Sequence, residues 1–361
     1  MASVSAVDDN AALGTDEAVD QTDETLAVEG SSAGTTDDDS GLKELDDGNK
    51  STKNLLGATN DKEILGSTIT VDGNTFLDIQ NAIDSATAED TIYLNSQIYT
   101  GSGTEINIDK SLTIIGSEGC TLDAQGQSRI FNVAAADVTF KNITLINGRS
   151  SADGGAIYTE TGNVTVSGST FVNNTAAQRG GAISTYTGNV NVSGSTFVNN
   201  TASNDDGGAI DTDKGNVNVS GSTFVNNTAK KDGGAIYTET GNVNVSGSTF
   251  VNNTAAQRGG AIYTNNGNVN VSGSTFMNNT GYNGGAIFTT SYGNVTVSGS
   301  TFVNNTAKYR GGAIYTNKGN VNVSDSHFVN NTVSNDGGAI YTDKGNVNVS
   351  GSTFVNNTSY N

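Results

Sequence analysis

The sequence predicts an all-β fold, a single-stranded parallel β-helix in which each coil corresponds to one sequence repeat. Three observations lead to this prediction: a repeat of nearly fixed length, short runs of strand-forming residues within each repeat, and the absence of proline from all 361 residues. The repeat length is roughly 26 residues, and a self-similar period between roughly 20 and 50 residues is typical of solenoids and other repeat arrays.

The segment 1–63 differs in composition from the rest of the chain, because it is rich in Asp and Glu, has few lysines and has no aromatic residue. A segment with so much like charge buries too little apolar surface to offset the entropy of ordering. We therefore predict a disordered acidic segment over residues 1–63. Its opening run Ser3–Ala6 resembles the small-residue end of a secretory signal without the charged and apolar parts, and we interpret it as the remnant of a removed signal peptide.

Residues 64–153 are predicted to form an N-terminal cap and irregular first coils. Phe76, Ile79, Ile83 and Ala86 lie at helical spacing, which predicts an amphipathic helix over residues 75–86 that covers the first coil and shields its edge. Strands are predicted at Thr91–Leu94, Glu105–Ile108, Ser111–Ile115, Arg129–Val133 and Val138–Ile146.

Residues 154–361 contain eight repeats, each with a Gly-Gly-Ala-Ile motif and a Phe-x-Asn-Asn-Thr motif at nearly constant spacing. Gly-Gly-Ala-Ile begins at Gly154, Gly180, Gly207, Gly233, Gly259, Gly284, Gly311 and Gly337. The repeats contain no leucine, which excludes leucine-rich repeats, and they are shorter than the roughly 40 residues of a propeller blade. The eight repeats are therefore interpreted as eight successive coils.

Each repeat holds three short runs rich in β-branched and aromatic residues, separated by Gly, Asn or Ser, and we predict one strand from each run. Alternation points Val164 and Val166 inward. Ile157 and Phe171 recur in every unit and are expected inside as well. The position after Ile157 varies between Tyr, Ser, Asp and Phe, so we expect it to face solvent.

Stacking of equivalent residues predicts two internal columns. The first is a core stack of phenylalanines: Phe171, Phe197, Phe224, Phe250, Phe276, Phe302, Phe328 and Phe354. The second is a structural ladder of turn amides, each bonded to the coils above and below: Asn174, Asn200, Asn227, Asn253, Asn279, Asn305, Asn331 and Asn357. The lack of proline agrees with this arrangement, because nearly every strand is central and its backbone N–H groups must donate.

Composition excludes several classes of protein and site. Cys120 has no second cysteine, and His327 is the only histidine, so neither a disulfide framework nor a Cys/His zinc site is expected. We expect Cys120 to be a small buried residue and His327 a surface substitution. The net charge of −20 argues against a nucleic-acid partner. The sequence contains no run of about 18 apolar residues, so it predicts no membrane-spanning segment. No catalytic residue, metal ligand or cofactor is predicted.

The paired motifs resemble the repeats of known surface proteins. Gly-Gly-Ala-Ile with Phe-x-x-Asn is similar to the repeat of chlamydial polymorphic outer-membrane proteins. The Asn/Thr-rich form, with Asn-Val-Asn-Val-Ser and Phe-Val-Asn-Asn-Thr, most resembles adhesin-like proteins of methanogenic archaea, an Asn/Thr-rich large surface protein family. The resemblance covers about residues 64–361. It implies a right-handed, pectate-lyase-like β-helix that is secreted or displayed at the cell surface and used in attachment. Family members often carry wall or membrane anchors, and none is recognised here.

Three functions remain open. The resemblance implies a non-catalytic adhesin or surface spacer, whose partners would be surface glycans or proteins of another cell. A polysaccharide lyase or hydrolase would use clustered carboxylates. An ice- or mineral-binding solenoid would use flat threonine ranks such as Thr170, Thr196 and Thr223. The best acidic cluster, which we interpret as solvated turn residues, consists of Asp205, Asp206, Asp211, Asp213, Lys214, Lys231 and Asp232.

Charged residues also form a column before the Gly-Gly pairs. The column reads Asp153, Arg179, Asp206, Asp232, Arg258, Asn283, Arg310 and Asp336. Four neighbouring pairs, 153/179, 179/206, 232/258 and 310/336, have opposite charge. We predict that they pair between coils and help to set the coil register. Each repeat also has two Asn-x-Ser/Thr sequons, which would place glycans on outward asparagines such as Asn191, Asn218 and Asn244 in an exported protein.

Overall fold

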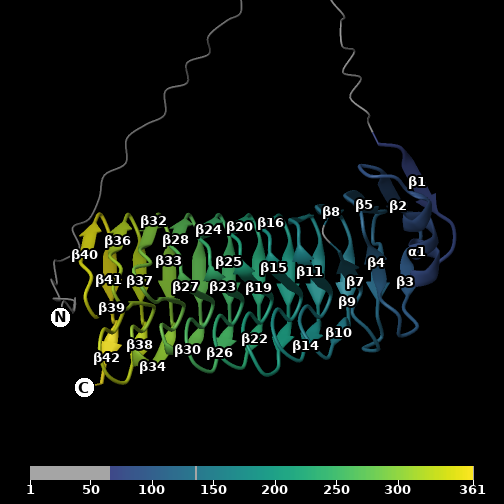
Figure 1. Ribbon diagram of the computed structural model, residues 1–361. Helices are drawn as coiled ribbons and strands as arrows, with labels where there is room; N and C mark the ends of the chain where they lie inside the picture. The colour runs from purple at the N-terminus through teal and green to yellow at the C-terminus, as the bar shows by residue number, and fades with distance from the viewer. Residues whose placement is uncertain (1–65, 135, 361) are drawn as a thin grey trace, which may run out of the picture. The chain divides into compact units, whose positions relative to one another are not determined.

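The computed structural model describes residues 66–134 and 136–360. These residues form a right-handed parallel β-solenoid of about 11 coils, with about 26 residues per turn and one α-helix (Figure 1). The predicted fold class is thereby confirmed. The predicted disordered segment, residues 1–63, lies outside the described residues.

Four parallel sheets, which we name A to D, run along the solenoid, and a regular coil passes through them in the order C, A, B, D. Sheet A contains β1 (Thr68–Val71), β2 (Thr91–Leu94), β5 (Leu112–Gly116), β8 (Val138–Lys141), β12 (Val164–Ser167), β16 (Val190–Ser193), β20 (Val217–Ser220), β24 (Val243–Ser246), β28 (Val269–Ser272), β32 (Val295–Ser298), β36 (Val321–Ser324) and β40 (Val347–Ser350).

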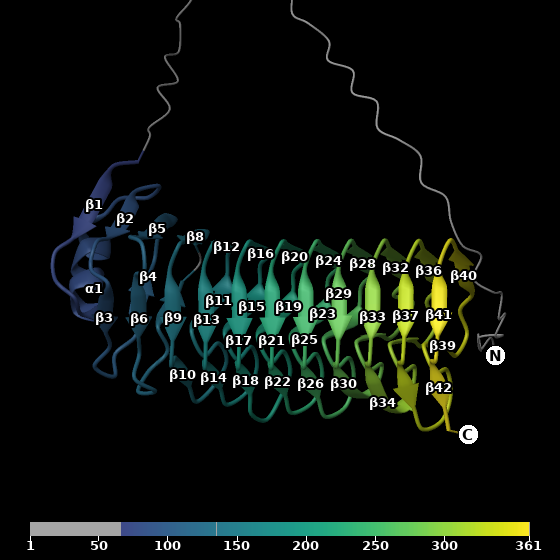
Figure 2. The same cartoon turned by 180° about the vertical axis from the view of Figure 1, so that it is seen from behind.

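Sheet B is best seen from behind (Figure 2). It contains β3 (Ile98–Thr100), β6 (Thr121–Asp123), β9 (Thr144–Ile146), β13 (Thr170–Val172), β17 (Thr196–Val198), β21 (Thr223–Val225), β25 (Thr249–Val251), β29 (Thr275–Met277), β33 (Thr301–Val303), β37 (His327–Val329) and β41 (Thr353–Val355).

Sheets C and D follow the same axis. Sheet C contains β4 (Ile106–Ile108), β7 (Phe131–Val133), β11 (Ile157–Thr161), β15 (Ile183–Thr187), β19 (Ile210–Lys214), β23 (Ile236–Thr240), β27 (Ile262–Asn266), β31 (Ile287–Thr289), β35 (Ile314–Thr316) and β39 (Ile340–Thr342). Sheet D contains β10 (Arg149–Ser150), β14 (Thr175–Ala176), β18 (Thr201–Ala202), β22 (Thr228–Ala229), β26 (Thr254–Ala255), β30 (Thr280–Asn283), β34 (Thr306–Arg310), β38 (Thr332–Val333) and β42 (Thr358–Ser359).

Two predictions of strand number were wrong. Each repeat contributes four strands rather than three, because a short strand of sheet D follows the buried Asn. Most sheet D strands have only two residues, too few to show alternation. The predicted run Val138–Ile146 is two strands, β8 and β9, because Asn142 turns the chain with a positive φ of 55°.

The Gly-Gly pair marks the point where the sheet D segment folds back against the main coil. A Cβ on Gly155 would lie 2.1 Å from the carbonyl oxygen of Gly181 and 2.7 Å from the backbone nitrogen of Thr175. Gly154 has a φ of 62°, which a residue with a side chain adopts only with strain. Glycine is therefore required twice in succession to let the two backbones meet.

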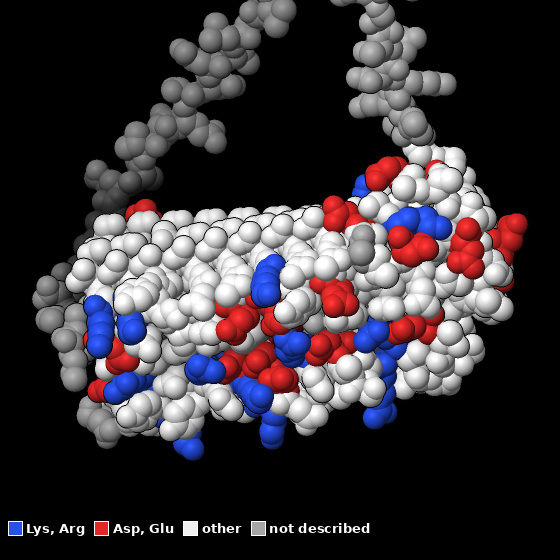
Figure 3. Space-filling view, viewed as in Figure 1, with Lys and Arg blue, Asp and Glu red and all other residues white. Residues whose placement is uncertain are grey.

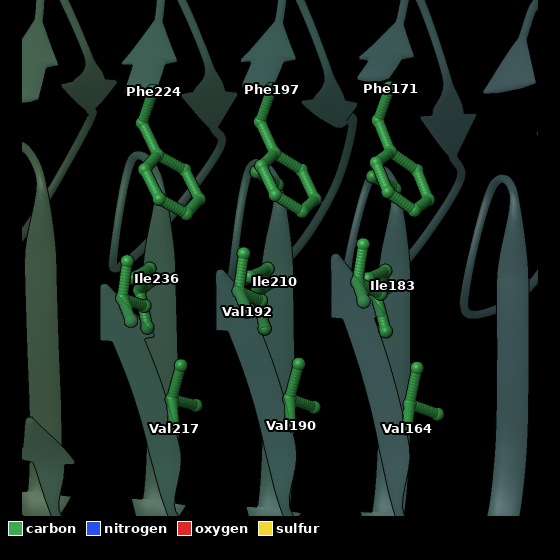
Figure 4. Packing of buried hydrophobic residues seen from close by; sticks show 14 of the residues in the cluster. Val164, Phe171, Ile183, Val190, Val192, Phe197, Ile210, Val217, Phe224 and Ile236 are labelled. Atoms are coloured by element: carbon green, nitrogen blue, oxygen red, sulfur yellow. The ribbon is translucent and has the colours of Figure 1, made fainter. Parts of the chain in front are cut away.

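The core consists of ranks of identical residues, as Figure 4 shows for three coils. Val164, Val166, Ile157 and Phe171 are fully buried, which confirms their predicted inward orientation. Equivalent Phe rings stack at centroid distances of 4.6–4.8 Å and at interplanar angles of 1–4°. Such small angles mean that successive repeats are almost untwisted, so each outer face is nearly flat.

Helix α1 (Phe76–Ser85) covers the first coil, as predicted. Thr75 is its N-cap and forms a reciprocal capping box with Asp78. Phe76, Ile79 and Ile83 are buried, and the helix contacts β1, β2 and β4. The first edge of the solenoid core is therefore shielded from pairing with another chain.

Candidate functional site

The outer face of sheet A carries a shallow trough of about 420 Å³ over β12 to β32. Its walls come from the Val-Asn-Val-Ser strands, in which the valines point into the core and the polar residues alternate outward. A second hollow of about 210 Å³ continues the same face over β32 to β40. We call these two hollows the sheet A trough. Its repeated polar residues are Asn191, Ser193, Asn218, Ser220, Asn244, Ser246, Asn270, Ser272, Asn322, Ser324, Asn348 and Ser350.

The trough asparagines form a ladder at the surface. The Nδ2 atoms of Asn218 and Asn244 each donate to the Oδ1 atom of the preceding asparagine at 2.8 Å, and Asn270 donates to Asn244 at 2.9 Å. An amide has two donor hydrogens and two acceptor lone pairs. Each interior asparagine of the ladder therefore keeps one donor and one acceptor for a ligand, and the neighbouring serine adds a hydroxyl.

The trough is nearly uncharged. Figure 3 shows that charged side chains gather below the sheet A face of the regular coils, whereas the surface along the sheet A strands of those coils is almost entirely neutral. The outward asparagines predicted as glycan acceptors, Asn191, Asn218 and Asn244, lie in this trough and are half-buried. The site is thus suited to a neutral polar ligand that extends along the solenoid axis.

The eight predicted ladder asparagines lie inside the solenoid and not in this trough. Asn253 is fully buried: its Nδ2 donates to Asn279 Oδ1 and to the Phe224 carbonyl, each at 3.0 Å. Its Oδ1 accepts from the backbone N–H and the Nδ2 of Asn227, again at 3.0 Å. All four bonding sites of the side chain are satisfied, so this column has a structural role.

The outer face of sheet C corrects one prediction. The position after each inward isoleucine was expected to face solvent, but most of these side chains are buried. Five aromatic residues form a second cluster outside the core: Tyr237, Tyr263, Phe288, Tyr315 and Tyr341. Arginines cover it, with the guanidinium of Arg258 at 4.8 Å from the Tyr263 ring and that of Arg310 at 5.0 Å from the Tyr341 ring. The sequence signal that could have revealed this cluster is the recurrence of aromatic residues at this position together with the column of arginines before the Gly-Gly pairs.

The charged column pairs in three of the four predicted places. Asp153 pairs with Arg179 at 3.3 Å, Asp232 with Arg258 at 2.5 Å, and Asp336 with Arg310 at 3.5 Å. The predicted pair between Arg179 and Asp206 was wrong. Arg179 instead pairs with Asp213 at 2.6 Å, because this aspartate projects from the neighbouring strand β19.

The acidic cluster is partly neutralised and partly buried. Lys231 pairs with Asp205 at 2.8 Å, and the Asp206 carboxylate accepts the backbone N–H of Asp232 at 2.9 Å. Burial, with Asp232 and Asp205 nearby, raises the pKa of Asp206 to about 7. The prediction that these residues are solvated was wrong for Asp211 and Asp232, which are both buried. Neither carboxyl oxygen of Asp211 has a hydrogen-bond partner among the described residues.

Asp211 lies on the outer face of sheet C, on β19. Its burial raises its pKa well above the ordinary value, while Arg179 acts in the opposite direction. The burial of Asp232 likewise raises its pKa, against the effect of Arg258. Among the described residues, no group of three or more Asp, Glu, His or Cys side chains is arranged to hold a metal ion.

The remaining singled-out residues lie apart from one another. Cys120 is buried, and burial raises the pKa of its thiol to about 11. His327 is exposed on β37, with Nδ1 2.6 Å from the hydroxyl of Thr353. Thr170 and Thr196 lie on the outer face of sheet B beside a rank of valines, so that face is Thr-x-Val rather than Thr-x-Thr.

Comparisons with known proteins agree with the fold. The right-handed β-helix region matches residues 209–360, and the Chlamydia polymorphic membrane protein repeat matches residues 168–186. No curated protein matches the chain significantly. The described residues include no helix long and apolar enough to cross a membrane.

Several solved structures are similar to the chain at low identity. Pectate lyase Pel9A is 14% identical, with 77% of this chain and 78% of that chain covered and a TM-score of 0.43. The catalytic unit of a GH87 α-1,3-glucanase from Streptomyces thermodiastaticus is 15% identical, with 81% and 68% covered and a TM-score of 0.38. An endo-xylogalacturonan hydrolase from Aspergillus tubingensis is 15% identical, with 81% and 94% covered and a TM-score of 0.38.

Proposed function

We propose that the protein is a non-catalytic, surface-displayed adhesin that binds a neutral polysaccharide along the sheet A trough. The observation that carries this proposal is the trough itself, in which the same amide and hydroxyl groups recur coil after coil on a nearly flat, uncharged face. A linear polymer of hydroxylated units presents matching donors and acceptors along its length.

The geometry favours many weak contacts over one strong contact. Most coils of the trough offer one amide and one hydroxyl, and the coils of β12 and β32 offer a threonine in place of the amide. Successive contacts on one polymer become intramolecular after the first. The trough residues project from strands held in register on both sides, so little conformational entropy is lost on binding. The match to a polymorphic membrane protein repeat supports display at a cell surface.

Affinity electrophoresis tests this proposal. The full chain would be run through native gels cast with different neutral polysaccharides, and each gel would then be stained for polymer. We expect retardation in at least one gel with the polymer intact along the track. Free migration in every gel would contradict polysaccharide binding and favour a spacer or a protein-binding adhesin.

A polysaccharide-cleaving enzyme is the second candidate, and the half-buried carboxyl group of Asp206 favours it, because a protonated carboxyl group within reach of a substrate can act as a general acid. A cleared track in any of the gels would support this candidate and contradict a non-catalytic adhesin. The clearing should then be lost in Asp206→Asn.

A further inference from the structure

We propose that a cleft where sheet D begins binds a short oligosaccharide carrying one carboxylate group. The cleft has a volume of about 790 Å³ and is formed by residues 103–105, 126–129, 149–152 and 177. It lies at a different part of the coil from the sheet A trough, and none of its lining residues is shared with the trough.

The cleft exists because the four sheets do not start together. Sheet D begins at β10, whereas sheets A, B and C already have strands in earlier coils. In the preceding coil, residues 124–130 connect β6 to β7 through a turn at Gly126, with a φ of 71°. The cleft lies at this transition, between residues 103–105 and 126–129 of the earlier coils and residues 149–152 of the first sheet D segment.

Arg149 supplies a positive charge at the wall of the cleft. Its backbone N–H donates to the Ser128 carbonyl at 2.9 Å, which fixes the start of β10. Its side chain is exposed, and within the described residues it makes no hydrogen bond or ion pair. One free guanidinium at the cleft wall matches one carboxylate, which it can bind through two parallel hydrogen bonds.

The second arginine of the cleft is already occupied. Arg129 pairs with Glu105 at 2.8 Å and donates to the carbonyl oxygens of Gly154 and Asp153 at 2.9 and 2.8 Å. It also donates to the Ser150 hydroxyl at 3.1 Å. Arg129 thus holds the cleft wall in place, and the net charge available to a ligand is that of Arg149 alone.

The rest of the lining favours a sugar. Thr104, Gln127, Ser150 and Ser151 present hydroxyl and amide groups. Beneath this lining, the buried Ser128 hydroxyl has no hydrogen-bond partner among the described residues. No aromatic or branched aliphatic side chain is among the lining residues of the cleft. Such a lining offers little to the apolar side chains of a peptide.

Titration calorimetry with sialyllactose and lactose tests the proposal, because the two sugars differ by one carboxylate-bearing unit. The full chain should bind sialyllactose at least tenfold more tightly than lactose at low salt, and salt should weaken the binding. Arg149→Gln should reduce the affinity about tenfold, since an exposed charge-assisted contact is lost. Lys230→Gln is the matched control, because Lys230 is an exposed lysine that directly follows the sheet D strand β22. This variant should change the affinity less than twofold.

Three results would overturn the inference: equal affinity for the two sugars, equal effects of the two substitutions, or tighter binding of an acidic peptide than of sialyllactose. The melting temperature of Arg149→Gln would show that the fold is intact. The inference rests on the proposed function only in assigning a glycan ligand. Because Arg149→Gln should leave retardation by a neutral polysaccharide unchanged, failure of this site and failure of the trough are distinguishable.

Discussion

At the residue scale, the buried ladder amides add hydrogen bonds between coils to the packing of the apolar ranks. Each interior ladder asparagine, as shown by Asn253, is buried with every donor and acceptor satisfied, which avoids the penalty of burying an unpaired polar group. The turn residue before it takes the left-handed conformation, as in Asn252 with a φ of 55°. The Asn-Asn pair thus serves two purposes: the first residue turns the chain and the second ties the coils together.

Replacing one ladder residue should therefore be costly. Asn253→Ala leaves two donors of Asn227 without partners and removes one donor from the Phe224 carbonyl, and we expect a loss of about 3 kcal/mol in the free energy of unfolding. Asn244→Ala removes a link of the half-exposed ladder in the same coil and should cost less than about 1 kcal/mol. Urea unfolding of both variants measures the difference, and equal losses would contradict a stabilising role specific to the buried ladder.

Asp206 should make stability depend on pH. Its pKa is raised from an ordinary value of 3.8 to about 7, so the folded state retains a proton that the unfolded chain has lost between these values. The contribution of Asp206 to the free energy of unfolding should therefore be fully present below about pH 4 and decline as the pH rises to about 7. Asp206→Asn should flatten this decline in melting temperature and stabilise the protein at pH 8.

The control for this pH effect is Asp325→Asn, which changes an exposed carboxyl group in a turn of the β40 end of the solenoid. This variant should keep the full decline between pH 4 and 7. A wild-type melting temperature that rises over this range, or an unchanged profile in Asp206→Asn, would show that Asp206 does not hold a proton in the folded state.

At the scale of elements, ion pairs between coils help to align repeats that are otherwise almost identical. Arg258 pairs with the buried Asp232 of the preceding coil, and Arg310 pairs with Asp336 of the next. A slip by one whole coil would keep the Phe and Asn columns matched, since all repeats carry them. The charged column differs from coil to coil and so distinguishes the correct register from a slipped one.

Reversing one of these charges should destabilise the fold more than reversing a charge outside the column. Arg258→Asp leaves the carboxylate of Asp232 buried beside a like charge, and we expect a loss of about 1–3 kcal/mol. Lys318→Asp removes only a contact with the ring of Tyr292, at 5.1 Å, and should change stability by less than about 0.5 kcal/mol. Thermal unfolding compares the two variants. Equal shifts in melting temperature would contradict a role of the charged column in setting the coil register.

The sequence predicts those elements whose residues repeat without change. The Phe171 and Asn174 columns and the capping helix follow from period and alternation alone. The packing of the outer face of sheet C cannot be predicted in this way, because it depends on how the sheet D segment turns back against the coil at Gly155. A variable position next to Ile157 looked solvent-exposed, although arginines from that segment cover it. The trough and the Arg149 cleft arise from surfaces that meet only after coiling.

At the scale of the whole molecule, the flat faces of a rigid solenoid separate three kinds of surface. Sheet A presents neutral amides and hydroxyls, sheet B presents Thr-x-Val ranks, and the region over sheets C and D carries most of the charged groups of the coils (Figure 3). Because a polymer touches several coils at once, its affinity should depend on the number of intact trough asparagines rather than on one of them.

The most direct test of the adhesin proposal is affinity electrophoresis of the triple variant Asn218→Ala, Asn244→Ala and Asn270→Ala in a gel that retards the wild type. Thr249→Ala, on the sheet B face of the same coil as Asn244, is the matched control. We expect the triple variant to migrate freely and the control to be retarded like the wild type. Undiminished retardation of the triple variant, with its folding intact, would contradict binding in the sheet A trough.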